Sequence, residues 1–124
     1  MREIADEFMK LLAVIMVLVT LAVSTAAFSM MFGEIARDDE KARLDLFAIE
    51  LQNNPGAQGY IIGYGGSRPR YGTGQSRAER AREYLVRERG VDASRLVTLS
   101  GTSRATGATE LWLVPPGATP PRPR

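Results

Sequence analysis

The sequence predicts an α+β protein in which one N-terminal transmembrane helix precedes a small α/β sandwich. An apolar run without a charged residue extends from Leu11 to Phe32. After it, short β-rich runs alternate with helical stretches in the order helix, strand, helix, strand, strand. The chain of 124 residues leaves room for one compact domain beyond the run. We therefore divide it into a flank (1–10), a transmembrane helix (11–32), a domain (33–115) and a Pro-rich, disordered tail (116–124).

The apolar run is roughly 22 residues long, about the length that a helix needs to cross a bilayer core. Two alternatives remain open: a cleaved secretory signal, with small residues at its cleavage site, and a buried core helix. The acidic residues before Leu11 are wrong for a signal, and a domain of about 90 residues hardly covers so long an apolar helix. The small residues at which a signal would be cleaved are also expected to pack on other membrane helices; they are Ser24, Thr25, Ala26 and Ala27.

The elements of the domain are predicted in order from periodicity and stop signals. Gly33–Ile35 is expected to form a short strand stub. A helix over Asp38–Gln52 follows from an apolar stripe that includes Leu44 and Phe47, and the proline in Asn53–Gly56 ends it. The remaining elements are a strand over Gly59–Tyr64, a helix over Ser76–Arg89, and strands over Leu96–Ser100 and Thr109–Val114.

The glycine-rich loop from Gly65 to Gly74 is a candidate anion site. Its glycines can bring backbone N–H groups close to an anion, and it also carries Arg68 and Arg70. The loop lacks the Lys-Ser/Thr ending of a phosphate loop and the helix spacing of a dinucleotide fingerprint, so nucleotide binding has little support. Arg77 stands at the start of the following helix, where its head could reach the rim of the loop.

Composition excludes several classes of function. The chain contains no Cys and no His, which removes a thiolate nucleophile, a Ser-His pair and an imidazole metal ligand. We therefore expect no enzyme activity, no metal and no cofactor. Sixteen basic against fourteen acidic residues give a nearly balanced charge, which does not favour nucleic acid as a partner.

Several short segments of the domain form one larger pattern. They are Leu44-Asp45-Leu46-Phe47-Ala48, Asn54-Pro55, Tyr60-Ile61-Ile62-Gly63-Tyr64, Arg77-Ala78, Tyr84-Leu85-Val86, Gly90-Val91-Asp92 and Arg95-Leu96. This pattern resembles the OmpA-like peptidoglycan-binding domain over most of Ala42–Ser100. In that family a helix runs into a strand that ends in a Gly-His-Thr-Asp-like turn. A helix opening with an Arg-Ala pair follows, and then a Gly-Val…Arg-Leu turn.

The resemblance implies a ligand. Family members hold the diaminopimelate of cell-wall peptide with an aspartate after the first strand and with the arginine of the Arg-Ala pair. Arg77 stands at the arginine position, whereas the aspartate position falls at about Gly66 in a loop without a carboxylate. We therefore expect the fold to be kept and the site to be degraded, because the ligand ammonium loses its partner. The candidate ligand residues are Arg77, Gly65, Gly66, Arg68 and Arg70.

Two functions of different classes follow. The first is a non-enzymatic accessory subunit of a larger bacterial inner-membrane complex, for example an electron-transport or photosynthetic one, whose helix contacts the lipid bilayer and other subunits. The alternative is a membrane-tethered protein that binds peptidoglycan. An ion channel is not expected, because Leu11–Phe32 has no ionisable residue. In both cases the N-terminus is expected in the cytoplasm and the C-terminal domain in the periplasm.

Overall fold

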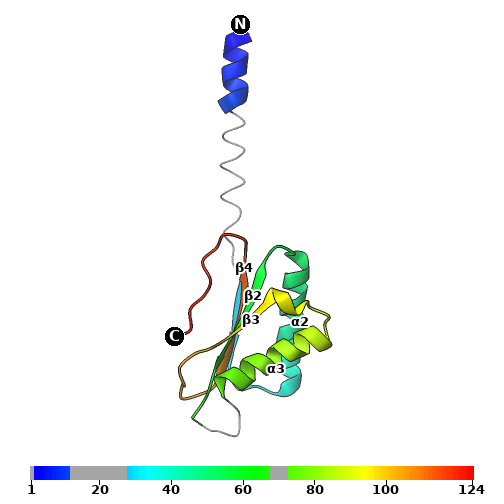
Figure 1. Ribbon diagram of the computed structural model, residues 1–124, viewed down its shortest axis with the longest axis vertical. Coiled ribbons are helices and arrows are strands. Elements are labelled where there is room, and N and C mark those ends of the chain that lie inside the picture. Colours follow the sequence, from blue (N-terminus) through cyan, green and yellow to red (C-terminus); the bar gives the residue numbers. More distant parts are fainter. Residues whose placement is uncertain (1, 12–27, 68–72) are drawn as a thin grey trace.

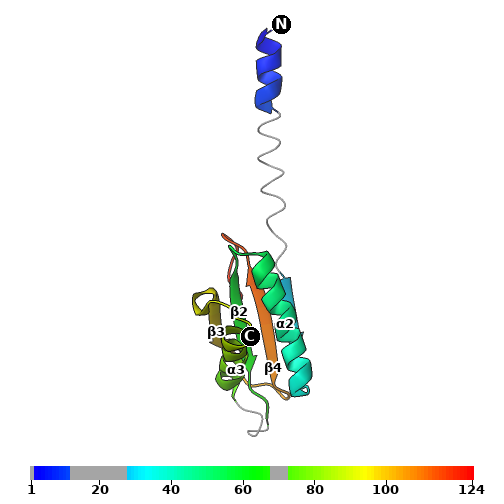
Figure 2. The same ribbon diagram turned by 90° about the vertical axis from the view of Figure 1, so that its right-hand side faces the viewer.

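The computed structural model describes residues 2–11, 28–67 and 73–124 of the chain. Over these residues the protein is α+β. A four-stranded sheet carries two helices, α2 and α3, on one of its faces (Figures 1 and 2). A further short helix covers residues 2–11.

The elements follow the order β1 (Phe28–Phe32), α2 (Arg37–Asn53), β2 (Gln58–Tyr64), α3 (Gly74–Arg87), the 3₁₀ turn η3 (Ala93–Arg95), β3 (Leu96–Ser100) and β4 (Ala108–Val114). The strand order in the sheet is β1-β4-β2-β3. Strands β2 and β3 are parallel, whereas β4 is antiparallel to both β1 and β2. The parallel pair is joined through α3, as a parallel connection requires.

The main core lies between the sheet and the helices. Every second residue of each strand points to this face, and the apolar stripes of both helices bury against it. Phe47 and Leu51 of α2 and Leu85 of α3 are almost fully buried. Phe28 of β1 stacks on Phe47 with ring centroids 6.5 Å apart, so α2 covers the β1 side of the sheet. In Figure 2, α3 lies beside it over β2 and β3.

The predicted transmembrane helix over Leu11–Phe32 is wrong where the structure describes it. The structure describes a helix over residues 2–11, and Phe28–Phe32 form strand β1. The side chains of this strand alternate, and Phe32 is buried against the helices, which explains why an apolar stretch forms a strand here. Among the described residues, none of the helices has both the length and the apolar character to cross a bilayer. The predicted inner-membrane location, with a cytoplasmic N-terminus and a periplasmic domain, required that helix and is corrected with it.

The residues between these two segments, 12–27, lie outside the described part of the chain. They include the predicted membrane-packing residues Ser24, Thr25, Ala26 and Ala27.

The other predicted elements agree with the structure within a few residues. Helices α2 and α3 and strands β2, β3 and β4 lie where the periodicity places them, and β3 has the predicted bounds. The predicted strand stub at Gly33–Ile35 is wrong, because the first strand ends at Phe32 and these three residues connect it to α2. The predicted order therefore lacks β1, and the sheet has four strands rather than three.

The second face of the sheet holds a small polar cluster. Glu110 is 5% exposed, and its carboxylate accepts hydrogen bonds from the Tyr64 hydroxyl at 2.9 Å and from the Trp112 indole at 2.7 Å. The guanidinium of Arg104 lies 3.6 Å from the centre of the Tyr64 ring. These contacts satisfy a carboxylate that would otherwise be costly to bury.

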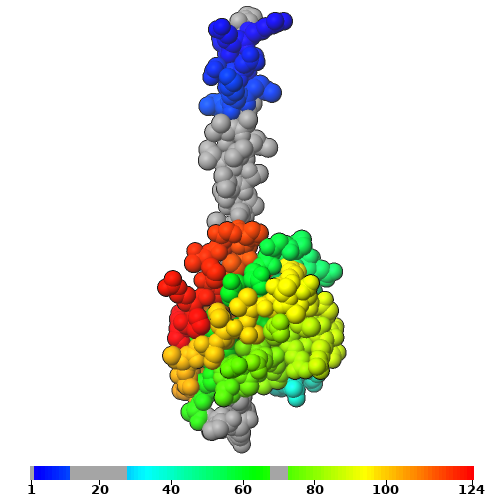
Figure 3. Space-filling view, in the orientation of Figure 1, coloured from blue at the N-terminus to red at the C-terminus, as the bar shows by residue number. Residues whose placement is uncertain are grey.

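The segment after β4 turns back along this face. Figure 1 shows it on the side of the sheet opposite the helices, and Figure 3 shows it in orange to red along one flank of the domain. The Arg124 carbonyl accepts a hydrogen bond from the Thr102 hydroxyl at 2.7 Å, and the Arg124 amide donates to the Tyr64 hydroxyl at 3.4 Å. The predicted domain boundaries stay predictions.

Candidate functional site

The site lies where β2 ends and α3 begins. Gly63 and Gly74 bring the two backbones together: a Cβ atom on Gly63 would lie 2.7 Å from the Gly74 carbonyl carbon and 3.1 Å from the Ala78 nitrogen. Thr73 caps α3 by accepting a hydrogen bond from the Ser76 amide at 3.1 Å. This docking points the first turn of α3, with Arg77, into the end of the sheet.

Arg77 is held below the surface at this place. The residue is only 3% exposed, and its Nη2 donates a hydrogen bond to the Gly33 carbonyl at 3.3 Å. Its Nε is buried and has no hydrogen-bond partner among the residues that the structure describes. Burial and the neighbouring Arg80 lower the pKa of the Arg77 guanidinium, while the carboxylates of Glu40 and Glu34 partly oppose this shift. A buried donor without a partner is rare and costly, and an incoming acceptor relieves the cost.

A carboxylate that the sequence did not point to lies beside this arginine. Glu34 follows β1 and is exposed, and its Oε1 accepts a hydrogen bond from the Gly107 amide at 3.1 Å. The same oxygen lies 2.8 Å from the position that a Cβ atom on Gly66 would occupy. The structure thus places a carboxylate next to the residue at which the resemblance expects an aspartate.

Arg77 and Glu34 converge on one point, the position that a Cβ atom on Gly107 would occupy. Glu34 Oε1 lies 3.2 Å from this point, and Arg77 Nη1 lies 3.3 Å from it. The Tyr64 carbonyl oxygen also lies 3.2 Å from this point, so the absence of a side chain on Gly107 lets these groups come close together. An anionic and a cationic group that face the same small space can hold a zwitterion, with its ammonium on Glu34 and its carboxylate on Arg77.

The structure brings together only some of the predicted ligand residues. Gly66 and Arg77 both lie beside Glu34, and the Gly65 carbonyl accepts a hydrogen bond from the Arg104 amide at 2.8 Å. Arg68 and Arg70 lie outside the described residues. Within the described ranges no group of acidic residues is arranged to hold a metal ion.

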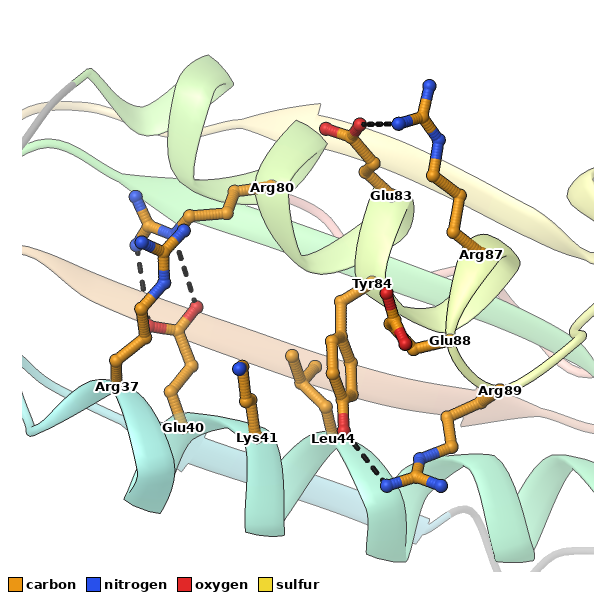
Figure 4. Close-up of a pocket in the computed structure, with 10 residues that line it drawn as sticks. All are labelled: Arg37, Glu40, Lys41, Leu44, Arg80, Glu83, Tyr84, Arg87, Glu88 and Arg89. Carbon is orange, nitrogen blue, oxygen red and sulfur yellow. Dashed lines mark hydrogen bonds and ion pairs between the residues drawn. The ribbon is translucent and has the colours of Figure 1, made fainter.

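A hollow with a volume of about 720 Å³ separates α2 from α3 (Figure 4). Its rim is charged, and two ion pairs lie on it. Arg80 reaches Glu40 at 3.4 Å, Arg87 reaches Glu83 at 3.0 Å, and the Tyr84 hydroxyl lies 3.1 Å from Arg89. We interpret the Arg80–Glu40 pair as a contact that joins the two helices, with Leu44 buried beneath it, whereas the Glu83–Arg87 pair lies within α3.

Neither a protein-family profile nor a curated protein matches the sequence of this chain significantly.

Proposed function

We propose that this domain is a non-enzymatic binding module of the OmpA-like type, and that its ligand is the diaminopimelate of peptidoglycan peptide. The observation that carries the proposal is the pair formed by Glu34 and Arg77 around Gly107. The resemblance requires one carboxylate and one arginine at this end of the sheet. The sequence offered only the arginine in the matching place, and Glu34 supplies the carboxylate from another segment.

The order of the elements gives further support. Helix α2 leads into β2, α3 opens with Arg77 in its first turn, and the turn after α3 leads through Arg95 into β3. This is the succession that the resemblance implies for Ala42–Ser100. The guanidinium of Arg95 donates hydrogen bonds to the carbonyls of Leu51 and Ala57 at 2.9 and 3.0 Å. These hydrogen bonds hold the end of α2 against β2.

The chemistry of the ligand matches the two charged groups. The far end of diaminopimelate carries an ammonium and a carboxylate on one carbon. Glu34 can accept hydrogen bonds from the ammonium, and Arg77 can donate to the carboxylate from Nη1, the nitrogen that lies near Gly107. Each of these hydrogen bonds is charge-assisted and contributes about 1.5–3 kcal/mol. A lysine at the same position of the wall peptide ends in an ammonium alone and would leave Arg77 without its acceptor.

The accessory-subunit function predicted first depended on a membrane helix that the described structure contradicts, and it is not put forward. A non-enzymatic role is the part of that prediction that the proposal keeps. No described contact assigns a reaction to any side chain of the site, so binding alone is proposed.

The test is co-sedimentation of the protein with purified peptidoglycan that contains diaminopimelate. We expect free diaminopimelate to compete, and peptidoglycan with lysine in place of diaminopimelate to bind at least about tenfold less well. Glu34→Gln should weaken binding by about tenfold or more, because it removes the charge that faces the ammonium. Gly107→Ala should weaken it as well, because its methyl group fills the point between the two charges.

Glu88→Gln is the matched control. Glu88 is an exposed glutamate at the end of α3, on a part of the domain away from Gly107, and the same change of charge there should leave binding unaltered. If Glu34→Gln binds peptidoglycan as well as the wild-type chain does, the proposed role of the site is wrong.

A further inference from the structure

Strand β1 leaves one edge of the sheet open. It is the outermost strand on its side, and among the described residues its only strand neighbour is β4. Its sequence, Phe28 to Phe32, contains no charged residue and no proline. Natural sheets usually protect an edge with such residues, and an unprotected edge readily accepts another strand.

Exposed apolar side chains lie near this edge on both faces of the sheet. In the described part of the domain, three large apolar residues are exposed by half or more: Met31 at 50%, Leu46 at 53% and Ile49 at 51%. Met31 belongs to β1, and Leu46 belongs to α2, the helix that covers the β1 side of the sheet (Figure 2). Ile49 is different, because it lines the hollow toward α3 with Ala48 and Val91.

The charged residues of α2 also lie on two different flanks of the helix, one toward α3 and one toward the β1 edge. Asp45 faces α3, where it accepts hydrogen bonds from Arg89 at 2.6 and 2.9 Å. At about 100° of rotation per residue, Arg43 and Glu50 stand on the opposite flank of the helix, toward the β1 edge. An antiparallel copy of this flank would bring Arg43 near Glu50 of the copy on both sides of Leu46. The flank is therefore complementary in charge to itself.

From these observations we infer that the partner of this surface is a second copy of the same chain, joined through β1 and α2 by a two-fold axis. Such an axis perpendicular to the sheet pairs β1 with itself in antiparallel fashion. Residues directly opposite each other in antiparallel strands point to the same face of the sheet, so the axis must pass beside one residue and not midway between two. Met30 is the central residue of β1, and an axis there lets all five residues of the strand pair. Ser29 then lies opposite Met31 of the other copy.

The helices fit this arrangement. Neighbouring strands lie about 4.8 Å apart, and α2 lies over β1 and β4, so the two copies of α2 would be roughly 10 Å apart, which is a normal packing distance. Phe47 stacks on Phe28, which fixes α2 along the strand and places Leu46 within about one helical turn of the axis. The result is a continuous eight-stranded sheet in which Met31 and Leu46 are covered.

The register is tested by disulfide formation in the full chain, which has no cysteine of its own. A mixture of Ser29→Cys and Met31→Cys chains should form a mixed disulfide dimer under mild oxidation, because the two positions are directly opposite. Either variant alone should form it at least about tenfold less, since the two equivalent Cα atoms lie about 8 Å apart, beyond disulfide reach. Equal cross-linking of the single variants, or none in the mixture, would overturn the proposal.

A matched pair of substitutions on α2 provides a second readout. By analytical ultracentrifugation, the wild-type chain should show twice its 13.6 kDa mass. Leu46→Glu should weaken self-association by about tenfold or more, whereas Ile49→Glu, which has the same exposure on the other flank, should change it by less than about twofold. A monomeric wild-type chain, or an equal effect of both variants, would refute the interface.

Discussion

The close approach of Gly63 and Gly74 makes the substitution Gly63→Ala the most informative test of how the site is built. A Cβ atom on Gly63 would lie 2.7 Å from the Gly74 carbonyl carbon, whereas carbon atoms pack best at about 3.5–4.0 Å. Both groups are backbone, so no side chain can rotate away. The Gly74 carbonyl oxygen lies closer still to this Cβ position, so the first turn of α3 must move outward by at least about 1 Å.

The cost of this movement can be estimated from what α3 buries. Ala78, Ala81 and Leu85 are fully buried against the sheet, and a gap of about 1 Å forfeits up to half of the dispersion energy of such contacts. Overpacked sites typically lose about 1–3 kcal/mol, and this one belongs at the upper end. For a domain of this size, about 3 kcal/mol corresponds to a decrease in Tm of roughly 12–24 °C.

Thermal unfolding followed by circular dichroism measures this decrease, and Gly56→Ala is the control. A Cβ atom on Gly56 would meet only the Pro116 side chain, at 3.4 Å, which is ordinary contact. This control should keep the wild-type Tm or raise it slightly, because alanine restricts the unfolded chain. A Tm for Gly63→Ala within about 3 °C of the wild-type value would refute the proposed docking of α3.

Three further predictions concern side chains that hold the fold together. Arg95→Ala removes the hydrogen bonds to backbone carbonyls at the end of α2 and should lower the free energy of unfolding by about 2–3 kcal/mol in urea titrations. Hydrogen bonds from Arg89 and Tyr84 hold the pKa of Asp45 below its ordinary value of 3.8, so the stabilisation is present above pH 3.8 and is lost as the pH falls through the lowered pKa. Asp45→Asn should thus lower Tm at neutral pH, and the difference from wild type should shrink in acid. Burial and Glu110 raise the pKa of Tyr64 above 10, so Tyr64→Phe should destabilise the domain below pH 10 and lose this effect as the pH rises through the raised pKa.

The helices and inner strands could be predicted because their side chains repeat with the period of the element. Leu44, Phe47 and Leu51 recur at helical spacing, and all three are buried in α2. Strand β3 was found with its bounds because Gly90 ends the preceding helix and Gly101 follows the strand. These signals are local, so tertiary contacts are not needed to interpret them.

Strand β1 could not be predicted, because its alternation is hidden. In Phe28-Ser29-Met30-Met31-Phe32 only Ser29 is polar, and the strand follows directly on a longer apolar run. Because it lacks a period-2 pattern, the sequence of this segment predicts the end of a membrane helix and not a strand. What makes it a strand is its pairing with β4, from Phe28 opposite Leu113 to Phe32 opposite Thr109, which no property of the local sequence indicates.

The same pairing explains why only half of the candidate site could be predicted from the sequence. Arg77 could be located because its place in the first turn of α3 depends only on neighbouring residues. Glu34 could not, because it reaches Gly107 across 73 positions of the chain and does so only once β1 lies beside β4. A missing aspartate in one loop therefore does not show that a site has lost its negative charge, because strand pairing can bring a carboxylate from a distant segment of the chain to the same place. Glu34→Gln tests that argument directly: it removes a charge whose position depends on β1 and leaves Arg77 in place.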